Sequence, residues 1–280
     1  MNMEDRWKLA TLAHKYGILV VADEVYHLLD WRDVDDDTTT GTHCPRRPAR
    51  MAVIDGLLRA RMQQEPRQQN AVDTPSSQTF PHSRPGGCIS VSSFTKVFAP
   101  GVRCGWIECA RSSNDVMESL LNLGYIQSQG GCAPFVGDLI LCTSLSKGYS
   151  DKVLVKLNAA YRERSQRLVQ ALSSEPGIQL DTVPLGGYFI WVTFRGVDDA
   201  TDFLKRCTKH GVRFLPGSRC NVGNSSSDKE AKKEDQNDDC RRCARLCFAD
   251  LDTERLETGA ARLIAAYRDY LQRKSQQTQS

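Results

Sequence analysis

Residues 12–29 read LAHKYGILVVADEVYHLL, and the change of pattern within this stretch decides the fold. Apolar residues recur at helical spacing just before and inside it, at Trp7, Leu9, Ala10, Leu12 and Ala13. Gly17 can close the resulting helix at its carboxyl end. The apolar run 18–22 then predicts a strand buried on both faces, which stops at Asp23 and Glu24. A helix followed by such a strand is typical of an α/β fold, which places its chemistry at strand ends.

Composition excludes several classes of protein. The chain has 280 residues, of which 40% are hydrophobic and 25% charged, so it is not disordered throughout. A formal net charge of +3 favours neither nucleic acid nor a membrane surface as partner. No apolar run approaches the roughly 20 residues of a membrane span, and residues 1–5 lack the features of a signal peptide. We therefore expect a cytoplasmic protein.

Cysteine is frequent but does not indicate a disulfide framework. The 11 cysteines are odd in number and widely spread, so we expect them to be mostly reduced. Cys240 and Cys243 form a C-x2-C pair close to Cys247, yet no second pair completes a tetrahedral site. No metal site is predicted.

The pattern divides the chain near residue 150. A polar, loop-like insertion is expected at about 33–87, with one short helix around residues 51–58. Strands are predicted at 88–92 and 103–109, and helices at 116–123, 135–145 and 152–172. Beyond these we expect strands at 188–194, 212–215 and 244–248, helices at 199–210 and 253–271, and mobile polar segments at 224–239 and after 273. The second half therefore reads as a smaller α+β domain.

Four separated pieces carry candidate chemistry: Asp23-x-x-Tyr26, Ser93-x-x-Lys96, Arg103 and Arg245. A Ser-x-x-Lys pair also occurs at the nucleophile of penicillin-recognising enzymes. That chemistry needs Ser-Asp-Asn and Lys-Thr-Gly motifs, which do not follow here.

In their order and flanks, the pieces resemble the fold-type I, class I/II aminotransferases that use pyridoxal 5'-phosphate (PLP). The matching blocks are LAHKYGILVVADEVYHLL, SVSSFTKVFAPGVRCGWIECA, PLGGYFIW, GVRFLPGS and ARLCFA. The resemblance implies a partial large PLP-binding domain with a mainly parallel sheet at 1–150 and a small α+β domain at 151–280. The family's Asn-Pro-x-Gly turn, glycine-rich phosphate loop and ring-stacking aromatic residue have no counterpart, so we expect a truncated chain whose true N-terminus and any organellar signal lie upstream.

The resemblance also implies a role for each candidate residue. Asp23 would face the pyridine nitrogen of PLP, and Tyr26 would donate to its phenolic oxygen. Lys96 would form the Schiff base and then move the α-proton. Ser93 and Arg103 would hold the phosphate, and Arg245 would grip the substrate α-carboxylate.

The implied reaction moves an amino group between an amino acid and a 2-oxo acid, in a homodimer of the aminoadipate, kynurenine or aromatic type. Three alternatives stay open. One is another PLP enzyme, either a C-S lyase or a relative of aminocyclopropane-carboxylate synthase. The second is the effector domain of a transcriptional regulator, and the third is an inactive fragment.

Overall fold

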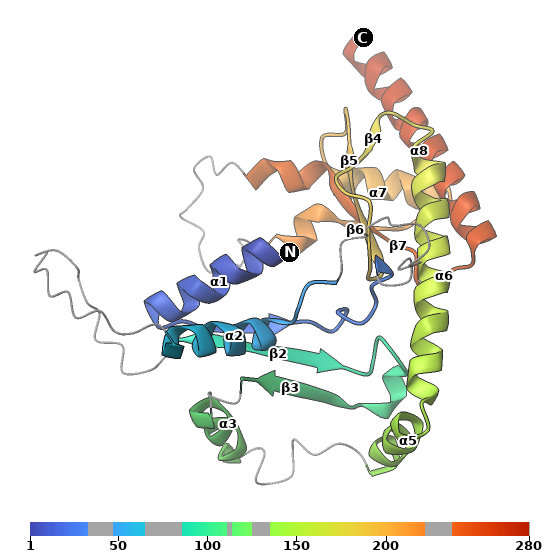
Figure 1. Ribbon diagram of the computed structural model, residues 1–280. Coiled ribbons are helices and arrows are strands. Elements are labelled where there is room, and N and C mark those ends of the chain that lie inside the picture. The colour runs from blue at the N-terminus through green and yellow to red at the C-terminus, as the bar shows by residue number, and fades with distance from the viewer. Residues whose placement is uncertain (33–46, 65–85, 111–113, 125–134, 222–236, 280) are drawn as a thin grey trace, which may run out of the picture. The chain divides into compact units, whose positions relative to one another are not determined.

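The computed structural model describes residues 1–32, 47–64, 86–110, 114–124, 135–221 and 237–279 (Figure 1). The chain forms two compact units, unit 1 with residues 1–156 and unit 2 with residues 157–280. Each unit has its own sheet. The α/β class expected from the sequence is confirmed.

The helix and strand predicted around residues 12–29 both form. Helix α1 (Met3–Tyr16) begins at Asn2, whose side chain accepts a hydrogen bond from the Asp5 amide at 2.8 Å. The helix ends at Gly17, which has a φ of 64°, a left-handed conformation that glycine adopts without a steric penalty. Strand β1 (Leu19–Asp23) follows.

Unit 1 contains a three-stranded mixed sheet in the order β1-β2-β3. Strand β2 (Gly87–Ser93) is parallel to β1, and β3 (Gly105–Cys109) is antiparallel to β2. Helix α2 (Met51–Gln64) packs with α1 against this sheet (Figure 1). The core between them contains Ala10, Ala13, Met51, Ile54, Leu58 and Cys88.

The prediction that β1 is buried on both faces is wrong. Val20 and Ala22 pack against the core of α1 and α2. Leu19 and Val21 are 47% and 59% exposed because successive side chains of a strand point to opposite faces, and these two point away from the helices.

The remaining elements of unit 1 follow the predicted order. They are η2 (Pro100–Val102), α3 (Asn114–Leu121), α5 (Phe135–Ser146) and the first part of α6 (Tyr149–Leu172). Strand β3 begins two residues later than predicted because Arg103 has a φ of 52°, which no extended strand accommodates.

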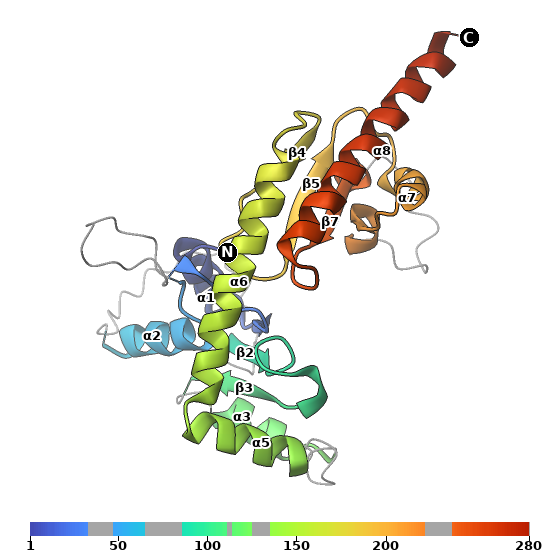
Figure 2. The same ribbon diagram turned by 90° about the vertical axis from the view of Figure 1, so that its right-hand side faces the viewer.

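Unit 2 has a four-stranded antiparallel sheet in the order β4-β5-β7-β6. Its strands are β4 (Ile178–Leu180), β5 (Phe189–Phe194), β6 (Leu215–Pro216) and β7 (Cys243–Cys247), with short 3₁₀ helices η3 (Gly217–Cys220) and η4 (Asn237–Arg242). The rest of α6, with α7 (Ala200–Lys209) and α8 (Thr253–Gln279), completes the unit (Figure 2).

Three features of unit 2 differ from the sequence prediction. Strand β4 was not predicted. Strand β6 comprises Leu215–Pro216 instead of residues 212–215, and Val212, whose amide donates to the Cys207 carbonyl of α7, lies outside the sheet. Helix α8 continues to Gln279, where a mobile tail was expected, through good helix formers such as Gln and Lys.

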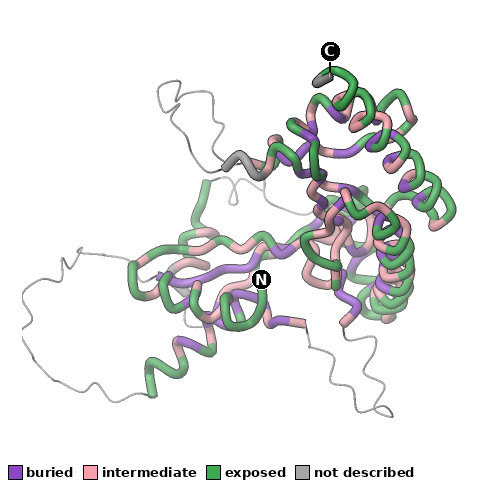
Figure 3. Tube along the Cα trace, turned by 90° about the horizontal axis from the view of Figure 1, so that it is seen from above, coloured by how far each residue is buried: buried purple, intermediate pink, exposed green. Residues whose placement is uncertain are grey.

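Along the helices, buried residues alternate with exposed ones, as the colours of Figure 3 show. In unit 2, aromatic rings form the centre of the core, with Phe194 and Phe203 at a centroid distance of 5.0 Å. Among the described residues, no helix combines the length and the apolar character needed to cross a bilayer. Of the predicted mobile segment 224–239, residues 224–236 lie outside the described residues, and residues 237–239 belong to η4 instead. Most of the insertion at 33–87 also lies outside the described residues.

Candidate active site

Asp23 and Ser93 are the last residues of two neighbouring parallel strands, β1 and β2. Asp23 is paired with Val91, so Ser93, two residues farther along β2, projects to the same face of the sheet as Asp23. The Asp23 side chain is exposed and accepts from the Val25 amide at 3.4 Å. The carboxyl edge of the sheet in unit 1 therefore presents an accessible carboxylate and a hydroxyl on the same face.

The Ser93 hydroxyl organises the loop that follows it. It is 2.9 Å from Thr95 Oγ1 and 3.3 Å from the Cys104 carbonyl oxygen, and it accepts from the Thr95 amide at 3.1 Å. The Phe94 amide also donates to the Cys104 carbonyl, at 3.1 Å. These contacts hold the two ends of the segment from Ser93 to Cys104 together, and Lys96 lies inside it.

Lys96 and Tyr26 come together although they are 70 positions apart in the sequence. The Lys96 ammonium lies 5.9 Å from the centre of the Tyr26 ring, within the range of a cation–π contact. Tyr26 belongs to the turn after β1, and Lys96 to the turn after β2. Both side chains are half-buried.

Arg103 follows η2 and lies near the end of the segment from Ser93 to Cys104, the Lys96 loop. Its side chain is exposed, and its Nη1 donates to the Pro100 carbonyl at 3.3 Å. A non-glycine residue with a positive φ is uncommon and is found more often at functional sites.

Arg245 belongs to unit 2, at the centre of β7 between Trp191 of β5 and Leu215 of β6. Its guanidinium carbon lies 4.1 Å from the centre of the Phe189 ring, a cation–π contact that restricts the position of the guanidinium group. Cys243 and Cys247 share its face of the strand, as the sequence predicted. No cluster of potential metal ligands is found among the described residues.

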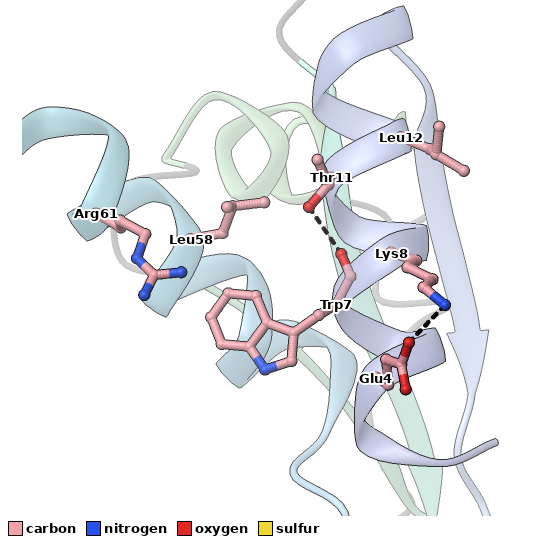
Figure 4. A pocket seen from close by; sticks show the side chains of 7 residues that line it. All are labelled: Glu4, Trp7, Lys8, Thr11, Leu12, Leu58 and Arg61. Carbon is pink, nitrogen blue, oxygen red and sulfur yellow. Dashed lines mark hydrogen bonds and ion pairs between the residues drawn. The ribbon is translucent and has the colours of Figure 1, made fainter. Parts of the chain in front are cut away.

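A groove between α1 and α2 is separate from these residues (Figure 4). Trp7 forms one wall, and the Arg61 guanidinium lies 6.0 Å from its ring centre. The Glu4–Lys8 ion pair, at 2.7 Å, borders the opening. None of the five predicted cofactor residues of unit 1 lines this groove.

Sequence reasoning assigned no role to Glu24 and His27, which lie beside Asp23 and Tyr26 in the sequence. Glu24 is 8% exposed and forms an ion pair with Arg6. His27 is half-buried near Arg50. The only available sequence signal was their position beside the predicted site residues.

Burial, reinforced by the charge of Arg50, lowers the pKa of His27 to about 4 from an ordinary value of 6.5. Between these two pH values the unfolded chain binds a proton at His27 that the folded chain does not. We therefore expect the free energy of unfolding to fall as the pH drops from 6.5 towards 4, and His27→Gln to flatten this fall. Urea denaturation at several pH values measures it, and parallel curves for the two proteins would contradict the prediction.

Comparison with known proteins identifies the family of the chain. The family model described as aminotransferase class I and II matches residues 1–263. The chain belongs to this family, as its sequence blocks indicated.

The individual relatives share only a modest sequence identity with this chain. The 2-aminoadipate transaminase of Thermus thermophilus is 27% identical over 191 residues, which are 66% of this chain and 42% of that protein. Among solved structures, the multiple substrate aminotransferase of Thermococcus profundus has a TM-score of 0.66 at 23% identity, covering 98% of this chain and 53% of that one. The kynurenine aminotransferase of Pyrococcus horikoshii has a TM-score of 0.66 at 24% identity, covering 97% and 53%. The chain spans less than half the length of the curated relatives that it matches.

Proposed function

We propose that this chain is the C-terminal part of a PLP-dependent aminotransferase, which moves an amino group between an amino acid and a 2-oxo acid. The observation that carries the proposal is the meeting of Lys96 with Tyr26, at 5.9 Å, next to the strand ends that bear Asp23 and Ser93. Family membership over residues 1–263 supports the same conclusion.

The residues present fit the chemical groups of PLP. Asp23 offers an accessible carboxylate for a protonated ring nitrogen, and Tyr26 a hydroxyl for the phenolic oxygen. Ser93 and Arg103 offer a hydroxyl and a guanidinium for the phosphate. When bound, PLP supplies an electron sink for the bond-breaking step.

Lys96 and Arg245 perform the remaining tasks. The Lys96 amine would link to the cofactor aldehyde and, once freed by substrate, carry a proton to and from the substrate Cα. The Arg245 guanidinium would donate two parallel hydrogen bonds to the substrate carboxylate and so orient the bond that breaks. Its cation–π contact with Phe189 already restricts its side chain, so less conformational freedom is lost on binding substrate.

We propose that residues 1–150 form the PLP-binding domain and residues 151–280 the small domain, which is close to the division into units at residue 156. The expected substrates are of the aminoadipate, kynurenine or aromatic type. The names of the Thermus and Pyrococcus relatives support the aminoadipate and kynurenine types.

We further propose that the protein acts as a homodimer in the cytoplasm. Large apolar side chains on α5 support an interface there, since Phe135 is 81% exposed and Leu139 56%. The described cysteines are all free, which is usual in a reducing compartment.

The test is to add PLP to the purified chain and record its absorbance, since a protonated lysine imine absorbs above roughly 400 nm. We expect this band, followed by its loss on adding 2-aminoadipate, kynurenine or phenylalanine and its return with 2-oxoglutarate. A band that no amino donor removes would favour a PLP-binding effector domain over a transaminase. Breakdown of the donor to ammonia would instead identify a lyase, and a folded chain with no band would contradict the proposal.

A further inference from the structure

Glu24 lies in the turn that contains Asp23 and Tyr26, and its side chain connects this turn to the rest of unit 1. It follows Asp23 directly, but it is 8% exposed whereas Asp23 is exposed, since the two side chains point to opposite faces of the sheet. The Glu24 amide donates to the Val91 carbonyl at 2.9 Å and extends the pairing of β1 with β2 by one residue.

Both oxygens of the Glu24 carboxylate are bound, each from different elements. Oε1 forms the ion pair with Arg6 of α1. Oε2 accepts from the Met51 amide at the start of α2, at 3.1 Å, and from the Ser90 hydroxyl of β2, at 2.5 Å. One side chain thus joins two helices and a strand to the end of β1.

These contacts keep Glu24 ionised. Burial alone would raise the pKa of Glu24, but the hydrogen bonds from Ser90, Arg6 and Met51, together with the charge of Arg6, lower it below its ordinary value. Three donors hold the buried carboxylate in one orientation, because any rotation would break a hydrogen bond and leave a buried oxygen lone pair without a partner.

The Glu24 main chain transmits this anchoring to the turn. Its carbonyl accepts from the His27 amide at 3.0 Å, and the next bond of the turn runs from the Leu29 amide to the Tyr26 carbonyl at 2.9 Å. Glu24 is therefore held at its amide, its carbonyl and both carboxylate oxygens. Asp23 comes directly before it, and Tyr26 follows two positions later.

We propose that Glu24 is a positioning residue for the cofactor site, an inference that rests on the proposed function. The ionised Glu24 carboxylate sets the direction in which Asp23 leaves β1 and the place of the Tyr26 ring beside Lys96. Glu24 touches no reacting atom and acts through its two neighbours.

The test compares Glu24→Gln, which keeps the shape and removes the charge, with Asp55→Asn as the matched control. Asp55 is likewise a buried and paired carboxylate, with His14 at 2.6 Å and Arg59 at 2.8 Å, but it lies on α2 and not in the turn. Two readouts apply to each purified full chain: the dissociation constant for PLP, and amide exchange of residues 23–29 without PLP.

For Glu24→Gln we expect the PLP dissociation constant to rise about tenfold and exchange of the turn to be faster by about the same factor, as expected for loss of a charged hydrogen-bond network. Asp55→Asn should change the PLP dissociation constant and the exchange rate of the turn by less than about twofold each, although it should lower thermal stability by a similar amount. If Glu24→Gln fails to fold, Ser90→Ala removes a single donor and should shift both readouts in the same direction.

Equal effects of Glu24→Gln and Asp55→Asn on the turn would overturn the proposal, because they would mean that Glu24 is only a structural ion pair. Failure of the unaltered chain to bind PLP would contradict the proposed function instead. In that case, amide exchange of the cofactor-free chain still decides whether Glu24 holds the turn.

Discussion

Lys96→Ala is expected to abolish the PLP absorbance band and to reduce transamination by roughly a thousandfold or more, because the variant loses both the linkage to the cofactor and the proton carrier. Alanine also removes the cation that lies over the Tyr26 ring. Absorbance with added PLP measures the first effect, and turnover of the best amino donor measures the second.

Lys147→Ala is the control for this prediction, since Lys147 is an exposed lysine of unit 1 outside the Lys96 loop. It should retain the band. A Lys96→Ala variant that keeps the band would show that PLP reacts with another amine and that the assignment of Lys96 is wrong.

Phe203→Ala should have the largest effect on stability. The Phe203 ring is fully buried and packs edge-on against Phe194 at 5.0 Å and Tyr270 at 5.4 Å. Removing a buried phenylalanine leaves a cavity and costs about 3–5 kcal/mol of unfolding free energy. Urea denaturation followed by circular dichroism measures this cost.

The control is Val183→Ala, because Val183 belongs to the same unit as Phe203 and is 61% exposed. It should change the unfolding free energy by less than about 0.5 kcal/mol, as is usual for surface sites. If Phe203→Ala cost no more than this control, unit 2 would not be organised around the aromatic core.

The elements that the sequence predicted well carry a local signal. Helix α7 has Asp199 before it, which caps its first turn by accepting from the Thr201 amide at 2.6 Å, and it lies within the predicted range. Strand β4 has three residues, too few for a periodic pattern to stand out, and β6 begins at Leu215 instead of Val212, whose amide is bound to α7.

The residues of the candidate site also divide into those with a local sequence signal and those without one. Asp23, Tyr26, Ser93, Lys96, Arg103 and Arg245 were all identified from sequence blocks, and their roles remain proposals. Glu24 was noted only as part of the charged pair that ends the predicted strand. Its contacts could not be read from the sequence, because its partners Arg6, Met51 and Ser90 are 18, 27 and 66 positions away.

The sequence by itself determined the family, the α/β class and the order of the elements, because apolar periodicity, helix caps and motif spacing are local properties of the chain. Only the tertiary structure decided that one face of β1 is exposed, that Lys96 lies over Tyr26, and that Glu24 is a buried ion. These features depend on which distant residues the fold brings within a few ångströms, and a buried charge is stable only when such partners are present.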